Sequence, residues 1–64
     1  MALWIARDSD GKLTLFDNHP MIMNGWFAPQ RGFNSLELDE RLFPEVTFEN
    51  SPQQIELKLI NNVS

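Results

Sequence analysis

Sixty-four residues are enough for one domain, 1–64, but a chain this short hides only about 60% of the surface that its unfolded form exposes, so its core must be thin. Because there is no cysteine, neither disulfides nor a thiolate-bound metal can stabilise the fold, which leaves buried aromatic residues or association into an oligomer. Nine acidic against five basic residues give a net charge of −4. This charge argues against DNA or RNA as a partner, because nucleic-acid binders need clustered positive charge.

The beginning of the chain, Met1 to Gly11, has neither the positively charged start nor the apolar run of a secretory signal peptide. No later stretch approaches the roughly 20 apolar residues of a membrane span. We therefore expect a cytoplasmic protein that does not enter a membrane, in the host cytoplasm if a phage encodes it.

The first half of the chain predicts two β-hairpins. Leu3–Ala6 and Lys12–Phe16 are short and apolar or alternating, and the Asp-Ser-Asp-Gly sequence at 8–11 is typical of the turn between two antiparallel strands. After the Pro20 loop, Met21–Met23 and Trp26–Ala28 flank Asn24-Gly25, the dipeptide that best suits a type I′ turn. Residues 29–32 are expected to form a loop.

The second half predicts further short strands. Leu36–Leu38 alternates, Asp39 can cap one short helical turn over 39–43 that Pro44 stops, and Val46–Phe48 is β-branched and aromatic. Gln54–Ile60 alternates most regularly, so we expect an edge strand with Ile55, Leu57 and Leu59 inward, followed by a frayed tail at 61–64. The predicted fold is all-β: one small antiparallel sheet or open barrel of five or six short strands.

Catalytic and metal-binding patterns are weak. His19 is the only histidine and has no evident orienting partner, so a surface role is the simpler interpretation. Asp8-x-Asp10-Gly11 lacks the further ligands of a calcium loop. The carboxylates at 37, 39, 40, 45 and 49 offer an acid and base pair in principle, but their positions on strand edges and turns are explained by solvent exposure. The sequence predicts a protein without enzymatic activity, catalytic residues, metal or cofactor.

The aromatic residues predict a binding surface. Trp26 and Phe27 are adjacent in a predicted strand and so point to opposite sides, and Trp4 lies opposite Leu3 and Ile5. Both faces of the sheet should therefore be apolar, and either a second copy of the chain or a ligand or partner should cover the extra face. We expect a homo-oligomer, in which a pocket can form between subunits.

Two arginines could recognise an anion. Arg7 and Arg31 each offer a planar fork to phosphate or carboxylate, although Arg7 can instead pair with the neighbouring Asp8 and Asp10, and Arg31 can be solvated in its loop. Indoles, an Asn-Gly turn and nearby guanidinium groups would suit a stacked base with a phosphate. The candidate ligand-binding residues are Trp4, Arg7, His19, Asn24, Trp26, Phe27 and Arg31.

Two stretches carry a resemblance to known proteins: ARD-x-DG-x-L-x-LF from Ala6 to Phe16, with the later Pro20, and LELDE-x-LFPEVTFE from Leu36 to Glu49, with Ile55-Glu56-Leu57. They resemble small uncharacterised proteins of phages and of Bacteroidota genomes, a likeness that assigns no activity. In size, lack of catalytic groups and aromatic content the chain is also similar to phage counter-defence proteins that act as sponges for nucleotide immune signals.

Two hypotheses follow. In the first, the protein is a non-catalytic, phage-type oligomer that sequesters a nucleotide-like ligand of the ADP-ribose type, as the sponge resemblance implies. In the second, it is a protein-interaction module or inhibitor that docks a host protein through an exposed aromatic face.

Overall fold

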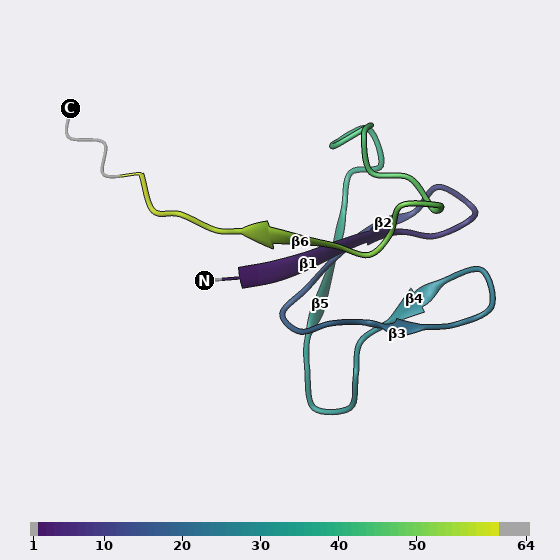
Figure 1. Cartoon of the computed structure of the whole chain (residues 1–64), viewed down its shortest axis with the longest axis horizontal. Helices are drawn as coiled ribbons and strands as arrows, with labels where there is room; N and C mark the ends of the chain where they lie inside the picture. The colour runs from purple at the N-terminus through teal and green to yellow at the C-terminus, as the bar shows by residue number, and fades with distance from the viewer. Residues whose placement is uncertain (1, 61–64) are drawn as a thin grey trace.

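The computed structural model describes residues 2–60, so the prediction for the tail at 61–64 lies outside the described part. Four strands form an antiparallel sheet in the order β5-β2-β1-β6, and two more form a separate hairpin, β3-β4 (Figure 1). The sheets are open, and the all-β prediction with five or six short strands is confirmed. The strands are β1 (Ala2–Arg7), β2 (Leu13–Phe16), β3 (Met21–Ile22), β4 (Phe27–Ala28), β5 (Ser35–Leu38) and β6 (Gln53–Glu56).

The pairing register assigns each side chain of the main sheet to a face. Ile5 pairs with Leu15, Leu15 with Leu36, and Leu3 with Ile55, and directly opposite residues of antiparallel strands share a face. We call this side the leucine face; it carries Leu3, Ile5, Arg7, Leu13, Leu15, Leu36, Leu38 and Ile55. The other side, the aromatic face, carries Trp4, Ala6 and Phe16. The expectation that both faces are apolar is confirmed.

The aromatic face is covered by the β3-β4 hairpin. Phe27 of β4 is buried against Ala6 and Phe16, and Trp4 and Phe48 pack against this cluster. The rings of Phe27 and Phe48 meet edge to face with centroids 6.0 Å apart. Of the adjacent pair in the hairpin, Phe27 is therefore inside, whereas Trp26 is half exposed.

The leucine face is covered at one end only. Val46, from the long connection between β5 and β6, packs on Ile5 and Leu13 to form a buried cluster. Three partly buried residues pack against this cluster: Leu15, Leu38 and Ile55. At the other end of the face Leu36 remains 61% exposed. The thin core expected for this length is thus divided between two clusters, one on each face of the sheet.

Three predicted elements differ from the structure. Residues 39–43 form a turn closed by a hydrogen bond from the Leu42 amide to the Asp39 carbonyl, 3.0 Å, and not a helical turn. Residues 46–48 lack a neighbouring strand, since Val46 packs across the leucine face instead of along an edge. The last strand, β6, is an edge strand as predicted but ends at Glu56, which leaves Leu57 and Leu59 exposed and not inward.

The second hairpin forms where predicted, with a different turn. The Met23 amide donates to the Trp26 carbonyl at 2.8 Å, and Gly25 has a φ of +88°. Asn24 does not have the positive φ that a type I′ turn requires at its first central residue. The Gly25 carbonyl accepts hydrogen bonds from the amide and hydroxyl of Ser9. The conformation of this turn is therefore tied to its contact with the first hairpin.

Candidate functional site

Arg7 lies at the end of β1 and binds main-chain carbonyls. Its Nε donates to Val46 at 2.6 Å, and the two terminal nitrogens donate to the carbonyls of Gly11, Glu40, Leu42 and Phe43 at 2.8 to 3.1 Å. A guanidinium has five N–H groups, and here each has a carbonyl partner. Arg7 pairs with neither Asp8 nor Asp10 in the structure and has no N–H left over for a phosphate or carboxylate.

The connection around Arg7 is bent to bring these carbonyls inward. Phe43 has a φ of +48°, a left-handed conformation that a bulky residue rarely adopts, and its carbonyl accepts from both Arg7 and the Val46 amide. Ser51 holds the other end of the connection, because its hydroxyl accepts from the Arg7 amide and donates to the Thr47 carbonyl. Arg7 therefore fixes the loop that covers the leucine face.

Trp4 and His19 lie together on the aromatic side. Their rings meet edge to face with centroids 4.5 Å apart. The imidazole Nδ1 lies 2.8 Å from the Pro20 carbonyl, and Gln30 donates to the His19 carbonyl at 2.7 Å. Both side chains are half-buried, so this pair closes the edge of the aromatic cluster and offers only part of its rings to solvent.

The tips of the two hairpins are joined by hydrogen bonds. The Asp8 carboxylate accepts from the Phe27 amide at 2.9 Å, and Ser9 binds the Gly25 carbonyl. The turn at 8–11 is confirmed by hydrogen bonds from the Gly11 amide to the Asp8 carbonyl and from the Asp8 amide to the Lys12 carbonyl. Asn24 and Trp26, which are exposed together with Met21, Ile22 and Met23 of the second hairpin, flank the Gly25 contact.

The predicted binding residues thus fall into separate groups. Trp4, His19 and Phe27 belong to the aromatic side, whereas Arg7 points to the opposite face of the same strand. Arg31 is exposed in the loop after β4 and makes no hydrogen bond or ion pair with any residue in 2–60. Within one chain, Arg7 and an indole do not converge on a common ligand position.

Of the carboxylates around 37–49, one is engaged by a neighbouring arginine. Asp39 is held by its neighbour Arg41, which donates to it from Nε, from a terminal nitrogen at 2.7 Å and from its amide. The hydrogen bonds from the Arg41 side chain lower the pKa of Asp39 below its usual value, which keeps this carboxylate ionised. Among residues 2–60 no three His, Asp or Glu side chains gather closely enough to hold a metal ion. The same residues contain no helix long and apolar enough to cross a membrane.

The feature that the sequence did not single out is the uncovered end of the leucine face. A surface hollow of about 140 Å³ lies there, lined by Leu3, Leu15, Phe16, Asp17, Asn34, Ser35 and Leu36. At its rim Asp17 and Asn34 are joined by three hydrogen bonds: the Asp17 amide donates to the Asn34 carbonyl, and the amide and side-chain nitrogen of Asn34 donate to the Asp17 carboxylate. The alternation of Leu13 and Leu15 with Thr14, and of Leu36 and Leu38 with Glu37, was the available signal, but it cannot tell a covered face from an open one.

Comparison with known proteins finds no matching family model, no matching curated protein and no matching solved structure.

Proposed function

We propose that this protein is a non-catalytic interaction module that docks a positively charged protein on the uncovered end of its leucine face. The observation that supports this proposal is the set of leucines around the hollow, of which Leu36 is the most exposed at 61%. Apolar residues grouped on a protein surface favour a macromolecular contact.

The size of the hollow favours a side chain of a protein over a small molecule. At about 140 Å³ it is smaller than the roughly 300–1,000 Å³ of typical ligand pockets, and it is open to the surface. One apolar side chain of a partner can fill it, while the surrounding sheet and the Asp17–Asn34 rim provide a flat contact.

The charge of the chain indicates the sign of the charge on the partner. The net charge is −4, and three of the five cationic side chains are already engaged: Arg7 by carbonyls, Arg41 by Asp39 and Lys58 by Glu56. Electrostatic attraction would therefore favour a basic partner and speed its association at low salt.

The experiment compares capture of host proteins by the wild-type chain, by Leu36→Asp and by Glu37→Gln, the last on the opposite face of the same strand. We expect one partner that is enriched by wild type and by Glu37→Gln, and that binds Leu36→Asp about 30-fold more weakly when titrated in purified form, as expected for loss of a central apolar contact. A partner that binds Leu36→Asp as tightly as wild type, or no partner at all, would contradict the proposal.

A further inference from the structure

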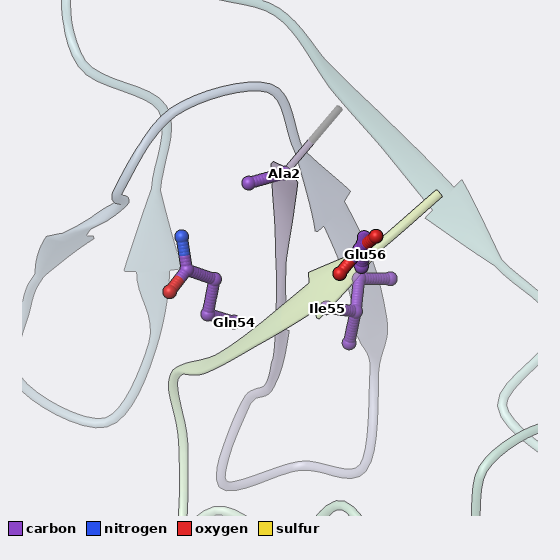
Figure 2. Close-up of a pocket in the computed structure, with 4 residues that line it drawn as sticks. All are labelled: Ala2, Gln54, Ile55 and Glu56. Atoms are coloured by element: carbon purple, nitrogen blue, oxygen red, sulfur yellow. The ribbon is translucent and has the colours of Figure 1, made fainter. Parts of the chain in front are cut away.

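The outer edge of β6 is open. β6 pairs with β1 on one side, and no strand within residues 2–60 pairs with its other side. A hollow of about 400 Å³ lies at the end of the β1-β6 pair, lined by Ala2, Gln54, Ile55 and Glu56 (Figure 2). Figure 2 shows Gln54 and Ile55 pointing to opposite sides of the strand. Unpaired backbone groups on such an edge are a template for another strand.

The chain that follows β6 continues its alternation without a neighbour to cover it. Leu57, Leu59 and Ile60 are 57%, 96% and 82% exposed, and the segment runs past β6 away from the rest of the molecule (Figure 1). In an extended chain Ile55, Leu57 and Leu59 share one side, and Glu56 and Lys58 share the other. This pattern is that of a strand with one buried face, although within residues 2–60 only Ile55 of this face is partly buried.

We propose that a second copy of this chain pairs with Gln54–Ile60, antiparallel and symmetric about Leu57. In this register Leu57 lies opposite its own equivalent, and Ile55 lies opposite Leu59 of the other copy. Glu56 lies opposite Lys58 on the other face, and the two-fold symmetry repeats this pair. Within 55–59 each apolar residue then meets an apolar one and each charge meets its opposite, which are the cross-strand pairs that stabilise antiparallel sheets, while Gln54 lies opposite Ile60.

Neighbouring registers lose this complementarity. Symmetry about Glu56 or about Lys58 places like charges directly opposite each other. A shift of one position places apolar residues of one copy opposite charged residues of the other. The sequence of 55–59 is therefore self-complementary in the register about Leu57, which is why we assign the occupant as a second copy and not an unrelated strand.

The contact would be isologous and would join the two sheets into one, with β6 of each copy beside the 58–60 segment of the other. Because directly opposite residues share a face, the leucine faces of both copies would lie on the same side. This inference does not depend on the proposed docking partner, since it uses the β6 edge and not the hollow near Leu36.

Single cysteines test the register, since the chain has none of its own. Directly opposite residues have Cα atoms about 4.5–5.5 Å apart, within disulfide range. We expect Leu57→Cys to form a covalent dimer under mild oxidation. The matched control is Leu59→Cys, whose side chain is even more exposed. Its Cα would lie about 13 Å from the equivalent Cα in the other copy, so this variant should form no disulfide-linked dimer. Equal cross-linking of both variants, or of neither, would overturn the proposal.

Charge reversal tests the ion pairs without a new covalent bond. Lys58→Glu and Glu56→Lys should each dimerise about tenfold more weakly than wild type in sedimentation equilibrium. Mixing the two variants should restore association, because one chain then has only lysines at positions 56 and 58 and the other only glutamates. Restoration in the mixture distinguishes a contact between copies from the Glu56–Lys58 pair within one chain, which both variants lose. Unchanged association in either single variant, or a mixture as weak as its components, would contradict the register.

Discussion

At the scale of single residues, Arg7 has the largest part in organising this fold. One side chain satisfies five carbonyls that belong to the first hairpin turn and to the connection over the leucine face. Lysine cannot replace it, because an ammonium has three donors around a single point and not a planar fork. The residue that the sequence indicated as an anion-binding candidate is, in the structure, bound to the protein's own backbone.

We expect Arg7→Lys to lower the free energy of unfolding by about 2–3 kcal/mol, because it leaves several carbonyls of a bent loop without a charged donor. Urea unfolding followed by tryptophan fluorescence measures the change. The matched control is Arg31→Lys, an exposed arginine whose replacement should change stability by less than about 0.5 kcal/mol. Equal stability of the two variants would show that the Arg7 hydrogen bonds contribute little.

At the scale of elements, the two hairpins are fixed relative to each other by their tips. Ser9 in the first turn binds the carbonyl of Gly25 in the second, and Asp8 binds the amide of Phe27. Through these contacts the β3-β4 hairpin, which has only two residues in each strand, is held over the aromatic face. An isolated hairpin of this length would be unstable, so its position depends on the junction.

Gly25→Ala tests the junction. A Cβ at this position would lie 3.1 Å from the Ser9 hydroxyl oxygen, in addition to the strain of a φ of +88°. Gly11→Ala is the matched control, because Gly11 has a similar φ of +97° but open space around it. We expect both variants to be destabilised by about 1 kcal/mol through the backbone, and Gly25→Ala to lose measurably more. Identical unfolding midpoints would mean that the hairpin tips move apart at no cost.

At the scale of the whole molecule, the predicted nucleotide-like ligand remains a prediction. In one chain Arg7 is occupied by carbonyls and lies on the opposite face from Trp4, so a stacked base with its phosphate would have to use Arg31, Trp26 and residues of another copy. The cytoplasmic location and the phage-type resemblance likewise remain predictions.

Calorimetry against nucleotides and ADP-ribose conjugates decides this prediction. We expect no binding with a Kd of about 10 µM or tighter, because the Arg7 guanidinium is occupied by main-chain carbonyls and lies on the opposite face of β1 from Trp4. Binding of that strength that is lost in Arg31→Ala and Trp26→Ala would contradict our proposal of an interaction module and support a nucleotide sponge. Thr14→Ala, away from both groups, serves as the control for stability.

Local chemistry in the sequence determined the positions of the two hairpins and of the edge strand β6. Asp and Gly at 8–11 and Asn-Gly at 24–25 place the hairpins, and the alternation in 54–56 places an edge strand, because turn dihedrals and period-two burial are properties of neighbouring residues. Only the tertiary structure decided which apolar face is covered, what Arg7 binds and where Val46 packs, because each depends on contacts between different elements of the chain. Leu57 and Leu59 show the same limit: their pattern predicts burial, but both are exposed in the described part of the chain.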